Sequence, residues 1–272
     1  MNVEPQVPTY TAGSWVDDMV VLPSCNLLIA DMINMSVNMI DAYTGRLISH
    51  VQLPGQPKKL CLLPGNRAAV SLPDKKMIQT IDVSADQLKL QDSVNVNEKC
   101  RGLAYLNNNF IVGLEDKQCV ASIHIKGQLL KSVSKDNTGK QLFIFPNNIC
   151  ATKEKSPSSI YVSDSGTYTI TRLSEELDVL QTFKVPGPLW PGGLTTAGGG
   201  QLLVRQCGFN VDNRLLVLDT STGEYTELSL GLGTRTVLCY GACVAFCPRL
   251  GRVYVYMKRL NGNDHIQVYE IS

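Results

Sequence analysis

Three cysteines near the end of the chain, Cys239, Cys243 and Cys247, form a C-x3-C-x3-C pattern that could bind a soft metal ion. On a helix this spacing would place three thiolates on one stripe, but a structural zinc ion takes four Cys or His ligands, and no fourth follows at zinc-finger spacing. Residues 241–246 are apolar and mostly small, and on a strand the three cysteines would share one face. We therefore predict a buried strand here and no metal site.

The nine cysteines of this 272-residue chain are scattered and odd in number. Residues 1–13 lack the apolar run of a signal peptide, so we expect a cytoplasmic protein with reduced thiols, most of them buried as small apolar side chains. No stretch reaches the roughly 18 apolar residues of a membrane span. The formal net charge of +1 gives no sign of a nucleic-acid or membrane partner.

Two aspartates, Asp31 and Asp164, end similar apolar runs at equivalent places in the chain. A carboxylate at such a position could bind a metal ion. It could equally accept hydrogen bonds from the backbone N–H groups of the turn that follows. Because the position recurs as part of a repeated pattern, we interpret both residues as turn residues.

The whole chain repeats a unit of roughly 45 residues, each with short β-rich runs separated by Gly, Pro, Asn and Asp turns. The second run of each copy begins near residues 27, 68, 110, 160, 202 and 253. Such units are typical of propeller blades. We predict an all-β six-bladed β-propeller of four-stranded antiparallel blades in a single domain, 1–272. The blades are expected at about 14–53, 54–96, 97–139, 140–187, 188–234, and 235–272 with 1–13.

The last copy ends after its third run, and the first residues of the chain have no other assignment. We expect residues 3–11 to supply the missing outer strand and so close the ring. Pro5 and Pro8 suit that place, because proline in a sheet is confined mainly to edges.

Residues 26–41, NLLIADMINMSVNMID, resemble the NHL repeat, and residues 160–164, IYVSD, resemble its first half. NHL repeats form six-bladed propellers, best known at the C-terminus of tripartite-motif ubiquitin ligases, where they select substrate proteins or RNA. The resemblance implies a recognition module of a larger ligase. Leu114, Gln206 and Met257 replace the motif aspartate in other copies, and the chain has no RING or B-box ligand set.

In a propeller, the loops between blades and those between second and third strands share one face. Here these loops carry more basic than acidic residues, with aromatic residues among them, and aromatic and Arg side chains are frequent anchors at protein interfaces. We predict a binding face that contains Lys58, Lys59, Arg101, Trp190, Phe209, Arg235 and Arg259.

Catalytic patterns are weak. The histidines His50, His124 and His265 lie far apart, with no Ser or Cys nucleophile beside them. We therefore expect a binding module that is not an enzyme, needs no cofactor, binds a protein and is monomeric as an isolated domain. One alternative is an RNA-binding NHL-like propeller. Another is a calcium-dependent hydrolase of the gluconolactonase type, with Glu98, Asn148 and Asp164 as candidate ligands.

Overall fold

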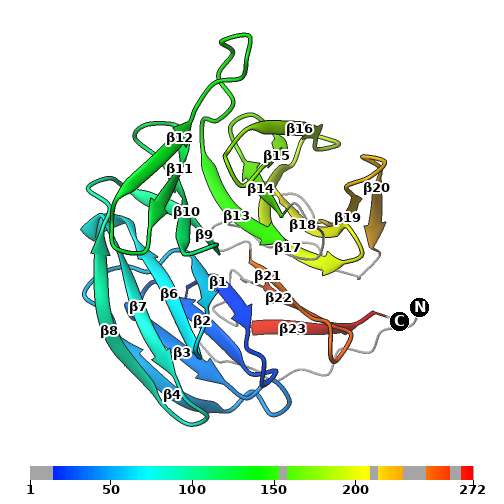
Figure 1. Ribbon diagram of the computed structural model, residues 1–272. Helices are drawn as coiled ribbons and strands as arrows, with labels where there is room; N and C mark the ends of the chain where they lie inside the picture. The colour runs from blue at the N-terminus through cyan, green and yellow to red at the C-terminus, as the bar shows by residue number, and fades with distance from the viewer. Residues whose placement is uncertain (1–14, 153–157, 209–213, 229–242, 258–264, 272) are drawn as a thin grey trace.

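Six antiparallel sheets surround a common axis in the computed structural model (Figure 1). The structure describes residues 15–152, 158–208, 214–228, 243–257 and 265–271. The predicted all-β six-bladed propeller is confirmed. Within the described ranges, five blades have four strands and the last has three. Residues 3–11, which we expected to complete the last blade, lie outside the described residues.

Each blade runs from an inner strand at the axis to an outer strand at the rim, and consecutive strands pair as neighbours. Blade 1 holds β1 (Val16–Val21), β2 (Leu27–Asp31), β3 (Ser36–Ile40) and β4 (Leu47–Gln52). Blade 2 holds β5 (Leu60–Leu63), β6 (Arg67–Leu72), β7 (Met77–Val83) and β8 (Leu88–Asn95). Blade 3 holds β9 (Cys100–Leu106), β10 (Asn109–Leu114), β11 (Cys119–His124) and β12 (Leu129–Val133).

The other three blades follow the same order. Blade 4 holds β13 (Pro146–Thr152), β14 (Ser159–Asp164), β15 (Thr169–Leu173) and β16 (Val179–Lys184). Blade 5 holds β17 (Trp190–Gly198), β18 (Gln201–Cys207), β19 (Arg214–Asp219) and β20 (Tyr225–Leu228). Blade 6 holds β21 (Val244–Cys247), β22 (Arg252–Met257) and β23 (His265–Glu270).

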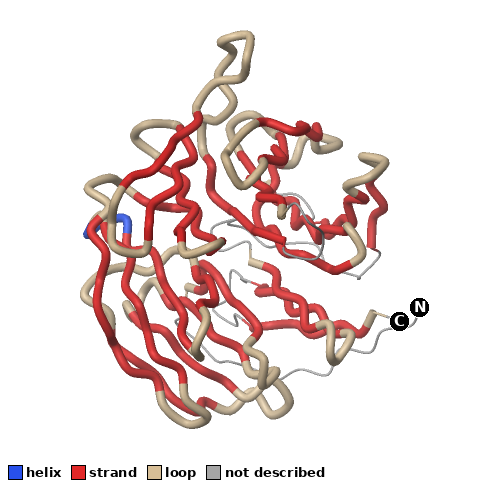
Figure 2. The backbone as a smooth tube through the Cα atoms, viewed as in Figure 1, coloured by secondary structure: helices blue, strands red, loops and turns tan. Residues whose placement is uncertain are grey.

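Strands dominate the described backbone, as Figure 2 shows, with one short 3-10 turn at Pro73–Lys75. No helix in the described ranges is long and apolar enough to cross a membrane. Second strands are the most buried: every residue of β2 and of β14 is buried. Outer strands such as β4 and β12 are largely exposed, which fits their place at the rim.

The core is divided into apolar clusters that lie between successive blades. One cluster joins blades 1 and 2 through residues such as Leu28 and Val70, and another joins blades 5 and 6 through Leu203 and Val253. A cluster that includes Ile29 and residues of blade 6 joins the last blade to the first. Burial of apolar surface between blades therefore continues around the whole ring.

Blades 3 and 4 approach each other closely near the axis. A Cβ atom added to Gly113 of β10 would overlap the carbonyl oxygen of Pro146 at the start of β13. A Cβ atom at Gly102 would lie 2.8 Å from Cγ1 of Ile149. A glycine at position 113 is therefore required by the distance between two backbones.

We predict that Gly113→Ala destabilises the protein by about 1–3 kcal/mol, since the added methyl group forces two strands apart. The change is measured as the free energy of unfolding in urea. Gly139→Ala is the matched control, because nothing lies within 4 Å of its added Cβ atom and only its positive φ of 85° opposes alanine. A loss below about 1 kcal/mol in Gly113→Ala would contradict the close packing of blades 3 and 4, whereas any loss in Gly139→Ala measures the cost of the positive φ alone.

Candidate binding face

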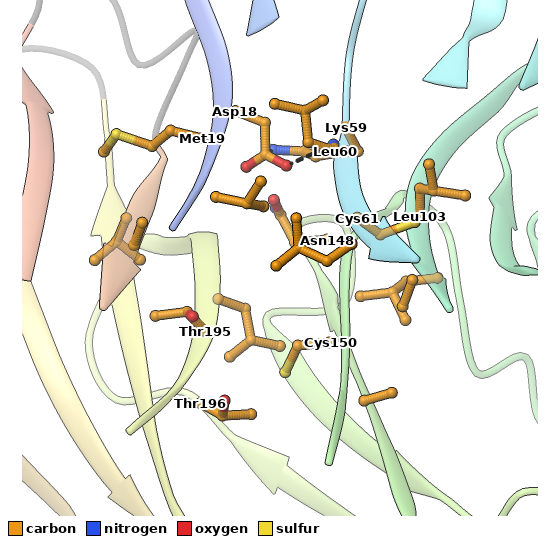
Figure 3. Close-up of a pocket in the computed structure, with 18 of the residues that line it drawn as sticks. Asp18, Met19, Lys59, Leu60, Cys61, Leu103, Asn148, Cys150, Thr195 and Thr196 are labelled. Atoms are coloured by element: carbon orange, nitrogen blue, oxygen red, sulfur yellow. Dashed lines mark hydrogen bonds and ion pairs between the residues drawn. The ribbon is translucent and has the colours of Figure 1, made fainter. Parts of the chain in front are cut away.

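The upper face is defined here as the end of the propeller where each inner strand begins. The loops between blades and the loops between second and third strands meet there. A cavity of about 320 Å³ runs along the axis from this face and is lined by the inner strand of every blade. Figure 3 shows Asp18 and Asn148 among the polar side chains around it, with Thr195 and Cys150 further along.

Two aspartates and two lysines join blades 1 and 2 beside this cavity. Lys58 Nζ lies 2.8 Å from Asp17 Oδ2, and Lys59 Nζ lies 3.7 Å from Asp18 Oδ1. The other carboxylate oxygen of Asp18 accepts a hydrogen bond from the backbone N–H of Leu60 at 2.9 Å (Figure 3). Burial raises the pKa of Asp18, and the positive charge of Lys59 opposes that rise only in part.

Further polar contacts link other neighbouring blades. The Ser71 hydroxyl donates to the carbonyl oxygen of Arg101 at 3.1 Å, from blade 2 to blade 3. The amide of Asn148 donates to the carbonyl oxygen of Gly192, from blade 4 to blade 5. The buried Arg205 donates to a carbonyl oxygen of blade 6 at 2.6 Å. Several polar groups near the axis therefore hold blades together.

The carboxylate of Asp164 organises the upper loops of blade 4. One oxygen accepts the backbone N–H groups of Ile144 and Phe145, both at 2.8 Å. The other accepts the N–H groups of Gly166 and Thr167 at 2.9 and 2.8 Å, and the Thr167 hydroxyl at 3.1 Å. This buried side chain therefore ties the loop before β13 to the loop between β14 and β15.

In blade 1, Asp31 has a similar place in the β2–β3 turn. Its carboxylate accepts the backbone N–H of Asn34 at 3.1 Å and the side-chain amide of the same residue at 2.8 Å. The interpretation of Asp31 and Asp164 as turn residues is therefore confirmed.

The loops held by Asp164 present two aromatic side chains to solvent. Phe145 is 45% exposed and Tyr168 is 38% exposed. Asn147, at the start of β13, donates a side-chain hydrogen bond of 2.8 Å to Ser165 of the second loop. A Cβ atom added to Gly166 would lie 3.1 Å from the ring of Phe145, so that ring packs against the second loop. We call Phe145 and Tyr168 the aromatic patch.

The predicted binding residues occupy different parts of this face. Lys58 and Lys59 lie beside the axis in ion pairs, and Ser71 connects the backbone of Lys59 to that of Arg101. The Arg101 guanidinium binds Glu115 at 2.6 Å. Trp190 begins β17 and is half-buried. The other three predicted residues, Phe209, Arg235 and Arg259, lie outside the described residues.

Basic side chains of blade 3 also face acids. Lys99 lies 3.4 Å from Asp116, and Lys117 lies 2.9 Å from Glu98. The positive charge of the loops in blades 1 to 3 is therefore largely compensated. The acids Glu98, Glu115 and Asp116 belong to the same loops, whereas Asp17 and Asp18 lie in β1 and so fell outside the loops that the sequence defines.

The proposed calcium ligands do not form a shared site. Glu98 pairs with Lys117, Asn148 donates to the carbonyl oxygen of Gly192 in β17, and both oxygens of Asp164 accept backbone hydrogens. The three histidines lie in β4, β11 and β23. Of the eight cysteines that the structure describes, all but Cys150 are buried, as predicted; Cys239 is outside the described residues.

Thiols beside the axial cavity are poor nucleophiles. Burial raises the pKa of Cys150 to about 12 and raises that of Cys61 further. A thiol becomes a strong nucleophile only as the thiolate, so both side chains are neutral at physiological pH.

No known family model matches the chain, and no curated protein matches its sequence. Solved structures resemble its fold. A catalytically inactive virginiamycin B lyase from Staphylococcus aureus with quinupristin has a TM-score of 0.62 at 17% identity, covering 100% of this chain and 89% of that one. A luciferin-regenerating enzyme has a TM-score of 0.67 at 15% identity, covering 98% of this chain and 96% of that one. The Swd1 β-propeller domain of Myceliophteria thermophila has a TM-score of 0.64 at 11% identity, covering 94% of this chain and 83% of that one.

These comparisons correct one expectation. We expected the chain not to be an enzyme, yet two of these three propellers are described as a lyase and a luciferin-regenerating enzyme. At such low identity the likeness shows the fold alone, and this fold also supports catalysis. The reason is geometric, because a propeller brings side chains from six separate inner strands to one axis.

We predict that Asp18→Asn changes the pH dependence of stability. The pKa of Asp18 is raised above 3.8 in the folded protein, so its ionisation costs more there than in the unfolded chain. Wild-type protein should therefore lose stability relative to the Asn variant as the pH rises from about 4 through the folded pKa. Urea unfolding at several pH values between 4 and 7 measures this difference. If the free energy of unfolding of wild type, relative to that of the Asn variant, stayed constant or rose over this pH range, the result would be inconsistent with the burial of Asp18.

Proposed function

We propose that this propeller binds a partner protein through its upper face, with the aromatic patch as the anchor. The observation that carries this proposal is the pair of exposed rings, Phe145 and Tyr168, on loops fixed by the buried carboxylate of Asp164. Exposed aromatic rings on rigid loops lose little conformational entropy on binding. Such residues commonly contribute 2 kcal/mol or more at protein interfaces.

The compensated charges favour a protein partner over RNA. Proteins that bind single-stranded RNA combine aromatic side chains with a positively charged groove that follows the backbone phosphates. Lys58, Lys59 and Arg101 instead face Asp17, Asp18 and Glu115. A polyanion at this place would have to compete with those carboxylates, whereas a protein surface of mixed charge would not.

The partner proposal has a more specific form. The NHL-like repeat in blades 1 and 4 supports a recognition propeller of a tripartite-motif-like ubiquitin ligase. The solved structures compared above are not described as tripartite-motif proteins. The ligase context therefore rests on the repeat alone, while the partner-binding proposal rests on the upper face.

We predict that the double variant Phe145→Ala with Tyr168→Ala weakens partner binding at least tenfold and changes the melting temperature by less than about 2 °C, since both side chains are substantially exposed. A phenylalanine analogue that crosslinks on illumination, placed at position 145 so that the aromatic ring is kept, identifies the bound protein. The dissociation constant of that purified protein is then measured for wild type and variant.

Tyr43→Ala is the matched control. Tyr43 is 60% exposed in the β3–β4 turn, at the opposite end of the blades, so its loss should leave the dissociation constant unchanged. Equal binding by the double variant and wild type would refute the aromatic patch as the anchor. Crosslinks chiefly to RNA, with affinity that falls steeply as salt rises, would favour the RNA alternative.

A further inference from the structure

Two buried cysteines meet where the first and last blades join. Cys25 lies in the hairpin between β1 and β2, and Cys247 ends β21 just before its hairpin with β22. Their sulfur atoms are 3.5 Å apart although 222 positions separate them in sequence. Both hairpins are at the lower face, opposite the aromatic patch.

The join between blades 6 and 1 rests on apolar packing around these sulfur atoms. Cys25, Cys247 and Tyr254 belong to the cluster that fills this interface. Beside it, Arg249 of blade 6 donates a hydrogen bond to the carbonyl oxygen of Pro23 at 3.0 Å. A covalent bond here would connect the two ends of the ring of blades.

We propose that Cys25 and Cys247 are a redox modification site, at which a low-molecular-weight disulfide of the glutathione class converts the two thiols into a disulfide that locks the ring. The proposal is independent of the partner and of the aromatic patch. It also goes beyond the expectation that the cysteines are simply reduced and buried.

The chemistry balances as two thiol–disulfide exchanges. One protein thiol loses its proton and attacks a sulfur of the small disulfide, which forms a mixed disulfide and releases one small thiol. The second protein thiol then attacks the protein sulfur of that mixed disulfide and releases the other small thiol. The two cysteines together lose two electrons and two protons, and the small disulfide gains them.

The local structure favours the second step and slows the first. The sulfur atoms need to approach by only about 1.5 Å to reach disulfide bonding distance. Burial raises the pKa of Cys25, so the thiolate is scarce while the hairpin is closed, and nearby Arg249 partly opposes that rise. Cys25 has a φ of 71°, an uncommon value for a residue other than glycine, in a tight turn at the rim of the interface. Local opening of this turn would expose the thiol without unfolding a blade.

The test uses the full chain, reduced and then incubated under native conditions with glutathione disulfide. Remaining thiols are blocked, and the protein is digested and mapped by mass spectrometry. We expect a peptide pair linked through Cys25 and Cys247. Because the bond closes a very long loop, the melting temperature should rise by about 5–15 °C and return to its starting value after reduction.

Single variants separate this pair from the other thiols. Cys25→Ser and Cys247→Ser should each abolish the rise on oxidation, while Cys150→Ser, the matched control at a less buried thiol, should keep it. If a serine variant fails to fold, the peptide map of wild-type protein decides alone. The proposal is overturned if that map finds both thiols free, or carrying only glutathione, or if Cys25→Ser shows the same rise.

Discussion

The upper face depends on the buried carboxylate of Asp164. Five hydrogen-bond donors from two separate loops converge on its two oxygens, so neither loop can move far without leaving this buried carboxylate short of donors. Phe145 belongs to one of these loops and Tyr168 to the other. The relative position of the two rings therefore follows from one side chain beneath them, which is how a partner site can be rigid although it lies on loops.

The ring itself imposes a second constraint. Neighbouring blades approach each other closely: a methyl group at Gly113, in the second strand of blade 3, would overlap a backbone oxygen at the start of blade 4. Charged side chains also connect neighbouring blades of the ring. Lys59 and Asp18 connect blades 1 and 2, and Arg205 connects blades 5 and 6. Some of the charged residues that the sequence suggests for a binding surface thus hold blades together instead. The exposed aromatic rings are therefore the clearer sign of a partner site.

Periodicity was enough to predict the blades, because a unit that buries its faces only against copies of itself must repeat in sequence. The turn role of Asp31 and Asp164 could also be predicted, since it depends on neighbours within the same hairpin. Contacts between blades could not be predicted, because they join residues that are far apart in the sequence. Asp18 is 41 positions from Lys59, and Cys25 is 222 positions from Cys247. Phe145 was missed for the same reason, because the carboxylate that bonds to its backbone N–H is 19 positions away.

Amide hydrogen exchange in Asp164→Ala tests the central claim most directly, that this carboxylate fixes the loops of the aromatic patch. The account predicts faster exchange at Phe145 and Gly166 than in wild type. The amide of Asn34, which bonds to Asp31 in blade 1, should keep its wild-type rate and so report that the ring is intact. Unchanged protection at Phe145 and Gly166 would contradict the account.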